Sequence, residues 1–234
     1  MTVSGHRHNE SRPARRRLRL PSLPMLFTQE ADMTNPDYTH LTLVVDRSGS
    51  MAEDREESQA GINTFIGEQF ALDGKFTVTL SQFDNAFETV ERMRDSAFTY
   101  ELEPRGMTAL LDAVGMEIVR TGDDLAELPE AERPGRVLLV VVTDGHENSS
   151  HEYTLAQVRD LLAVQKSQFG WEVQFLGADD AVWQGSELGV KTTRFSNNAA
   201  GKTAVYQAMS TSLMTYRVGA PDADFTMPEE VGTN

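Results

Sequence analysis

The regular alternation of apolar runs with helical periods is the feature that most constrains how this chain can fold. Runs such as LTLVV at 41–45 and RVLLVVV at 136–142 have almost no polar interruption, which is typical of strands covered on both faces. Between the runs, apolar residues recur at the three- and four-residue spacing of amphipathic helices. This alternation predicts a Rossmann-like, three-layer α/β fold, with a mostly parallel open sheet between two helical layers.

The pattern predicts six strands, at 39–45, 75–83, 86–93, 136–142, 171–177 and 191–195. Only Asp84 and Asn85 separate the second strand from the third, so we expect a tight antiparallel hairpin with the third strand at an edge. The run at 136–142 is the most apolar and is expected at the centre. Helices are expected at 56–72, from 108 onward, at 154–169, at 181–188 and along a final stripe from Val205 to Tyr216, with the acidic connection 122–135 on the surface.

The chain of 234 residues is long enough for one domain with a substantial core, which we place at 33–218. Residues 1–32 are rich in Arg and Pro without any period, and we predict a disordered basic arm. Met33 opens a natural lead into the first strand, so the arm is a candidate for a segment upstream of the true start. Residues 219–234 are polar and predict a flexible tail.

Charge and composition exclude several classes of function. The net charge is −15 although residues 1–32 hold six arginines and only three acids, so the rest of the chain is strongly acidic. An acidic body argues against nucleic-acid binding, which needs Lys and Arg to neutralise phosphates. The absence of cysteine excludes disulfides, thiolate catalysis and Cys-ligated zinc, and it is compatible with the cytoplasmic location that we expect. No run of about 18 apolar residues predicts a membrane span.

Three polar loops fall where the predicted fold would bring them together. DRSGSM at 46–51 and TDGHENSS at 143–150 directly follow predicted strands, and RGMTALLDA at 105–113 opens a helix. Open α/β sheets form their sites at the carboxyl ends of strands. The loops offer only oxygen donors, which suit Mg²⁺, Mn²⁺ or Ca²⁺, and Gly49 lets the first loop curve tightly. The donors are Asp46, Ser48, Ser50, Thr108 and Asp144.

The three motifs in this order resemble the metal-ion-dependent adhesion site of von Willebrand factor type A domains. The resemblance covers about Leu41 to Val218 and implies that those five residues hold a divalent ion, the hydroxyls directly and the acids often through water. It also implies that a protein partner completes the metal's coordination with a Glu or Asp side chain. Supporting or rim positions would be Gly49, Asp112, Gly145 and Glu147. The relatives it suggests are bacterial or phage proteins.

The sequence therefore predicts a binding module without enzymatic activity that uses a metal ion to hold an acidic partner. Its oligomeric state is left open. One alternative is metal-assisted phosphoester or NTP hydrolysis at the same strand ends, although only Arg47 and Arg105 supply positive charge near the loops. Another is a degenerate domain that binds no ion and serves as a scaffold.

Three further motifs have ordinary structural interpretations. Ser48 and Ser50 lack the G-x-S-x-G context of a hydrolase nucleophile. The histidines of the third loop, His146 and His151, could be imagined in a Ser-His-Asp arrangement but are expected as exposed loop residues. Gly201-Lys202-Thr203 resembles part of a phosphate-binding loop but lacks its first glycine, so we expect an ordinary helix start capped by Asn197 or Asn198.

Overall fold

The computed structural model describes residues 34–220 and 223–232. The chain divides into two units, 1–32 and 33–234, and all described residues belong to the second. The predicted basic arm at 1–32 lies outside the described residues.

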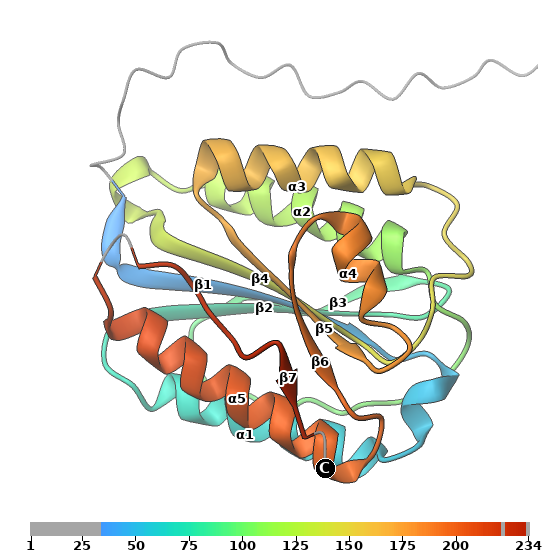
Figure 1. The fold of residues 1–234 in the computed structure, drawn as a ribbon. Coiled ribbons are helices and arrows are strands. Elements are labelled where there is room, and N and C mark those ends of the chain that lie inside the picture. Colours follow the sequence, from blue (N-terminus) through green and yellow to red (C-terminus); the bar gives the residue numbers. More distant parts are fainter. Residues whose placement is uncertain (1–33, 221–222, 233–234) are drawn as a thin grey trace, which may run out of the picture. The chain divides into compact units, whose positions relative to one another are not determined.

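Seven strands form one sheet in the described part of the chain, in the order β3-β2-β1-β4-β5-β6-β7 (Figure 1). Among the described strands only β3 is antiparallel, and it lies at an edge, as predicted, while β4 occupies the centre. One strand more is present than the sequence predicts. The strands are β1 (Asn35–Asp46), β2 (Lys75–Phe83), β3 (Phe87–Arg94), β4 (Pro134–Thr143), β5 (Glu172–Ala178), β6 (Lys191–Phe195) and β7 (Glu230–Val231).

Helices cover both faces of this sheet, which gives the predicted three-layer α/β architecture. α1 (Arg55–Phe70) and α5 (Ala199–Val218) lie side by side on one face. α2 (Leu110–Glu127), α3 (Leu155–Phe169) and the short α4 (Trp183–Leu188) lie on the other (Figure 1). Two 3₁₀ turns, Gly49–Ala52 and Glu130–Glu132, precede α1 and β4.

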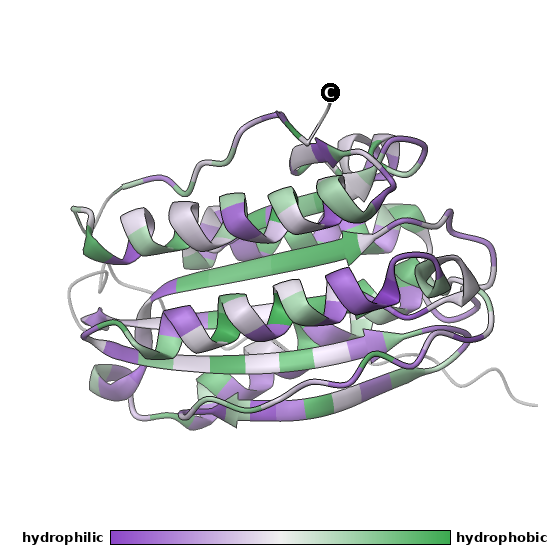
Figure 2. Cartoon of the chain, turned by 90° about the horizontal axis from the view of Figure 1, so that it is seen from below, coloured by the Kyte–Doolittle hydropathy of each residue, from purple (hydrophilic) through white to green (hydrophobic). Residues whose placement is uncertain are grey.

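Each face of the sheet has its own apolar core, because the strands are buried on both sides. Leu43 and Val140 pack with α1 and α5, whereas Val44 and Val141 pack with α2 and α3. Figure 2 shows a hydrophobic strand running between more mixed helices. Alternate residues of β1 and β4 therefore serve opposite cores, which explains why these runs are apolar throughout.

Local signals fix where two of the helices begin. Thr154 and Gln157 form the predicted capping box at the start of α3, with side chain and backbone bonded reciprocally. The Asn198 side chain accepts a hydrogen bond from the Gly201 backbone N–H at 2.9 Å and caps α5. The segment 201–203 is thus an ordinary first turn, as expected.

The acidic connection 122–135 is not a surface loop throughout, and this prediction was wrong for its first part. α2 continues to Glu127, because Leu125 packs with Val137 and Trp171 in a small third cluster. Asp124 pairs with Arg92 of β3, which holds the same turn to the sheet. Pro129 follows directly after these contacts and prevents further helix.

The segment after α5 also differs from the prediction of a flexible tail. Phe225 is completely buried in the α1/α5 core, 5.7 Å from the ring of Tyr216 in edge-to-face contact. β7 then pairs in parallel with β6 and extends the sheet. The polar composition of this segment gave no sign that Phe225 is buried. Its packing and the β7 pairing hold residues 223–232 against the rest of the domain.

Candidate metal centre

The three predicted loops meet at the carboxyl edge of the sheet because β1 and β4 are parallel neighbours. Backbone hydrogen bonds join each loop to the next. Gly49 N–H donates to the Gly106 carbonyl at 3.2 Å, and Asn148 N–H donates to the Thr108 carbonyl at 3.0 Å. The edge is thus built as one unit, with the first loop tied to the second and the second to the third.

The predicted oxygen donors of the first and third loops are within hydrogen-bond distance of one another. Ser48 Oγ lies 3.0 Å from Ser50 Oγ, and Ser50 donates to Asp144 Oδ1 at 2.5 Å. The Asp46 carboxylate accepts a bond from the Ser48 backbone N–H at 2.6 Å. Asp46, Ser48, Thr108 and Asp144 are buried, whereas Ser50 is exposed at the mouth.

Gly145 of the third loop borders a small hollow together with oxygens of the first and second loops. A Cβ placed on this residue would lie 2.9 Å from Thr108 Oγ1 and 3.3 Å from both Asp46 Oδ2 and Ser48 Oγ. The absent side chain therefore leaves space among two hydroxyls and a carboxylate. Hard oxygen donors around such a space fit Mg²⁺, Mn²⁺ or Ca²⁺.

Asp46 is a fully buried carboxylate that no arginine or lysine contacts in the described residues. Its other oxygen accepts a bond from the Thr143 hydroxyl at 2.6 Å, a residue that the sequence analysis did not single out. Burial raises the pKa of Asp46 to about 6 in spite of hydrogen bonds from Thr143 and Ser48, and the Asp144 charge adds to the rise. A divalent cation would compensate the buried charge.

The predicted supporting acids, Glu147 and Asp112, form hydrogen bonds with the loops and with α2. Glu147 accepts bonds from the Leu111 backbone N–H at 2.9 Å and from Ser150 Oγ at 2.7 Å, which joins the third loop to α2. Asp112 accepts three backbone N–H bonds from residues 151–153. Both acids therefore fix where the third loop runs.

Two residues that sequence reasoning did not assign to the site contact the third loop. The buried Gln184 of α4 donates to the Gly145 carbonyl at 2.9 Å and accepts from Glu147 N–H at 2.7 Å. Lys202, which the sequence presented only as part of an incomplete phosphate-binding motif, lies 3.4 Å from Asp144 Oδ2. Neither position has a local signature, because both come from helices distant in sequence.

The histidines of the third loop have other partners. His146 Nε2 is 2.7 Å from the Asp180 carbonyl, and its ring packs edge-to-face on Trp183 at 5.9 Å between centroids. The His151 side chain is exposed, as expected, and its backbone N–H binds Asp112. The Ser-His-Asp interpretation gains no support from these contacts.

The two arginines near the loops are held by acids. Arg47 is buried and donates to Asp84 at 3.1 Å and to Glu88 at 2.8 Å, while Arg105 donates to Asp84 at 2.7 Å. Although burial raises the pKa of Asp84, the hydrogen bond from Arg105 and the charge of Arg47 outweigh it and leave the pKa below its usual value. These guanidinium groups lock the β2–β3 hairpin beneath the second loop.

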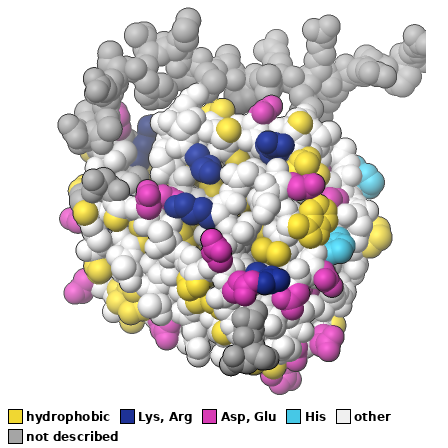
Figure 3. Space-filling view, viewed as in Figure 1, with side chains coloured by type: hydrophobic (Ala, Val, Ile, Leu, Met, Phe, Trp, Pro, Cys, Tyr) yellow, Lys and Arg dark blue, Asp and Glu magenta, His cyan; other side chains and the backbone are white. Residues whose placement is uncertain are grey.

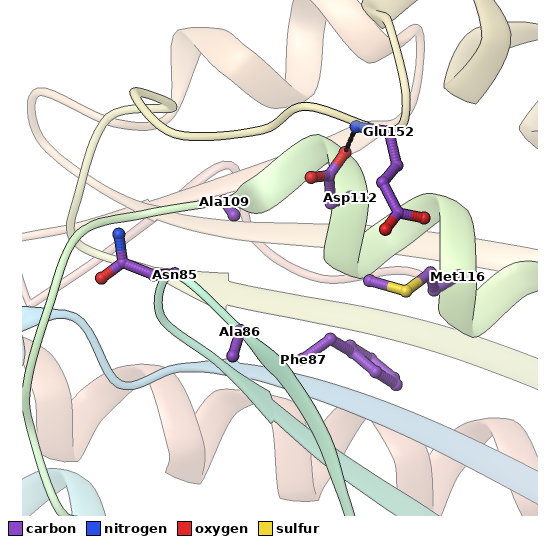
Figure 4. A pocket seen from close by; sticks show the side chains of 7 residues that line it. All are labelled: Asn85, Ala86, Phe87, Ala109, Asp112, Met116 and Glu152. Carbon is purple, nitrogen blue, oxygen red and sulfur yellow. Dashed lines mark hydrogen bonds between the residues drawn. The ribbon is translucent and has the colours of Figure 1, made fainter. Parts of the chain in front are cut away.

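A cavity of about 220 Å³ lies beside the site, between the β2–β3 hairpin and α2 (Figure 4). It is lined by Asn85, Ala86, Phe87, Ala109, Asp112, Met116 and Glu152. In Figure 4 Asp112 reaches the Glu152 backbone, in agreement with the hydrogen bond of 2.8 Å. The wider surface in Figure 3 carries scattered acidic side chains rather than one basic patch.

The described residues hold neither a cluster of metal-ligating acids and histidines nor a helix that could span a membrane. No three His, Cys, Asp or Glu side chains are grouped there as metal ligands, so the candidate centre depends on two carboxylates together with hydroxyls. None of the helices there has the length and apolar character that a bilayer span requires.

The fold is that of von Willebrand factor type A domains. One match is a von Willebrand factor type A protein from Catenulispora acidiphila (TM-score 0.53, 15% identity, 76% of this chain and 43% of that one). Another is proximal thread matrix protein 1 from the mussel byssus with a zinc-occupied MIDAS motif (TM-score 0.56, 13% identity, 76% and 48%). A third is the vWF domain of the type V pili tip protein Mfa5 from Porphyromonas gingivalis (TM-score 0.52, 10% identity, 78% and 97%).

This chain thus spans less than half the length of the first two proteins. The sequence matches no protein-family model and no curated protein. At these identities, the likeness establishes the fold alone.

Proposed function

We propose that this domain is a metal-dependent protein-binding module. A divalent cation, Mg²⁺ or Mn²⁺ by preference, would be held by Asp46, Ser48, Ser50, Thr108 and Asp144, and an acidic side chain of a partner protein would complete its coordination. The observation that carries the proposal is the hollow beside Gly145 of the third loop, where three oxygens of the first two loops lie 2.9–3.3 Å from a single point. One matched protein of the same fold has zinc at a site of this type.

The donor set leaves one coordination position for a ligand from a partner. Two carboxylates balance a divalent ion in formal charge, and the hydroxyls add ligands without charge. Mg²⁺ favours about six oxygen ligands and keeps water where the protein supplies fewer. Since Ser50 is exposed, one coordination position would open toward solvent, where a partner's Glu or Asp can replace water.

The hydrolase alternative is less well supported by the contacts of the basic residues. Phosphoryl transfer needs positive groups that reach the developing charge. Arg47 and Arg105 are paired with Asp84, and Lys202 is only 1% exposed. The scaffold alternative predicts no ion at all, which metal titration distinguishes directly.

The test is titration of the purified chain with Mn²⁺, followed by capture of partners in Mg²⁺ or in EDTA. We expect one saturable site that Asp46→Ala abolishes, and partner capture that EDTA reverses. Asp95→Ala, which removes an exposed carboxylate next to the far end of β3, is the matched control and should change neither result. Equal Mn²⁺ binding by the wild type and Asp46→Ala would refute the proposed site.

A further inference from the structure

Lys202 is a buried cation beside the candidate metal centre. It lies in the first turn of α5 and is 1% exposed, on the face that packs against α1. Its Nζ donates to the Glu53 carbonyl at 2.5 Å and lies 3.4 Å from Asp144 Oδ2. Lysine is almost never fully buried unless it is paired, so the Asp144 carboxylate is its electrostatic partner.

Asp144 joins this ammonium to the metal site, because its two oxygens have different partners. Oδ1 accepts the hydrogen bond from Ser50, which is itself a proposed metal ligand, whereas Oδ2 faces Lys202. One carboxylate is therefore shared between a fixed internal cation and the place proposed for a divalent ion. Asp46, the second carboxylate, accepts hydrogen bonds from Thr143 and Ser48 and has no ion-pair partner among the described residues.

We infer that Lys202 sets the charge of this site so that the bound metal retains an unbalanced positive charge and selects a carboxylate as its last ligand. The inference rests on the proposed function. The two aspartates and Lys202 together carry a formal charge of about −1, and a divalent ion brings it to about +1. Without the lysine, the loaded site would be neutral and an anion would gain little from binding it.

The positive charge of Lys202, which favours the anionic ligand, disfavours binding of the metal ion. The ammonium repels the cation and competes for Asp144, so the empty site binds metal less tightly than two unpaired aspartates would. An anionic ligand relieves this repulsion, which makes binding of metal and of carboxylate mutually reinforcing. The lysine thus determines which partner the site accepts and couples retention of the ion to the presence of that partner.

The experiment uses the whole chain, Mn²⁺ and acetate. Mn²⁺ affinity is measured by calorimetry without acetate, and acetate binding to the loaded protein by relaxation of the water protons that it displaces from Mn²⁺. In Lys202→Met, we expect Mn²⁺ affinity to rise about tenfold and acetate affinity to fall about tenfold. Lys202→Gln also removes the charge but can still donate to Glu53 O, so it should give the same pair of changes if the Met variant does not fold.

The matched control is Lys166→Met, which removes the same charge from an exposed position on α3 and should alter neither affinity. A purely structural role for Lys202 would weaken both affinities together, or leave both unchanged, and either result overturns the inference while Mn²⁺ binding by the wild type keeps the proposed function intact. If the wild type binds no Mn²⁺, the proposed function fails and this inference fails with it.

Discussion

At Gly145, the lack of a side chain is the property that the candidate site depends on. Its backbone is not in the left-handed region, so alanine is compatible with the local conformation. The position is nevertheless restricted, because an added Cβ would come within 2.9 Å of Thr108 Oγ1. An alanine variant at Gly145 keeps the oxygen donors of the three loops but fills the space between them.

Gly145→Ala should therefore lower Mn²⁺ affinity by about 10–100-fold, the range found when groups beside metal ligands are altered. Calorimetric titration measures this loss. Gly122→Ala is the control, because its Cβ would meet nothing closer than Gln165 Nε2 at 3.8 Å. That helical substitution should leave metal binding unchanged and add about 0.5–1 kcal/mol of stability. Full Mn²⁺ affinity in Gly145→Ala would show that the ion lies elsewhere.

At the scale of elements, the segment after α5 contributes more than its composition suggests. Phe225 is completely buried beside Tyr216, and removal of a buried phenylalanine costs about 3–5 kcal/mol. We expect Phe225→Ala to lower the free energy of unfolding by that amount in urea titration. Val218→Ala, at an apolar position that is 81% exposed, should change it by less than about 0.5 kcal/mol. Equal effects of the two variants would mean that residues 223–232 do not belong to the folded domain.

Elements whose pattern repeats along the chain were predictable, and those fixed by single distant contacts were not. The apolar runs of β1 and β4 specify buried strands by themselves, and the two-residue turn at Asp84 and Asn85 specifies the hairpin. The end of α2 depends instead on Leu125 meeting Trp171, and β7 on pairing with β6. A local reading of polar or acidic segments has no access to such contacts.

The same distinction holds for the candidate site. The predicted loop residues lie at one edge because strand order places them there. Thr143 lies in the third loop motif, but its role depends on a hydrogen bond to Asp46, 97 positions away, which the local sequence does not indicate. Lys202 reaches Asp144 from 58 positions away, so only the packing of α5 brings it to the site.

At the scale of the whole molecule, stability includes a buried polar network between the β1–β2 pair and α2. His40 is fully buried, with Nδ1 2.8 Å from Thr77 Oγ1 and Nε2 3.2 Å from Thr42 Oγ1. Thr42 continues through the Thr121 hydroxyl to Glu117, which is also buried. Burial lowers the pKa of His40 to about 3, so the native imidazole is neutral.

This network predicts a specific pH dependence. In the unfolded state the His40 imidazole is protonated below about pH 6.5, whereas in the native state it is protonated only below about pH 3. The stability contributed by neutral His40 is therefore complete above pH 6.5 and is lost as pH falls toward 3. Relative to His40→Gln, the wild type should lose about 1.4 kcal/mol per pH unit between about pH 6 and 4. Urea unfolding of both proteins measures the difference, in which groups common to both cancel. A difference that stays constant over this range would contradict a neutral buried His40.

The acidic charge of the whole chain bears on the proposed role of the metal. A chain with a net charge of −15 repels an acidic partner at long range, and a divalent ion at the strand ends would supply local attraction. The account therefore depends above all on where the ion binds.

The most direct measurement is anomalous scattering from crystals of this chain soaked in Mn²⁺. We predict one strong peak between the three loops, about 2.0–2.2 Å from Ser48 Oγ, Ser50 Oγ and Thr108 Oγ1, with Asp46 and Asp144 bound directly or through water. No peak at this position under saturating Mn²⁺, or a peak held by other residues, would contradict the account.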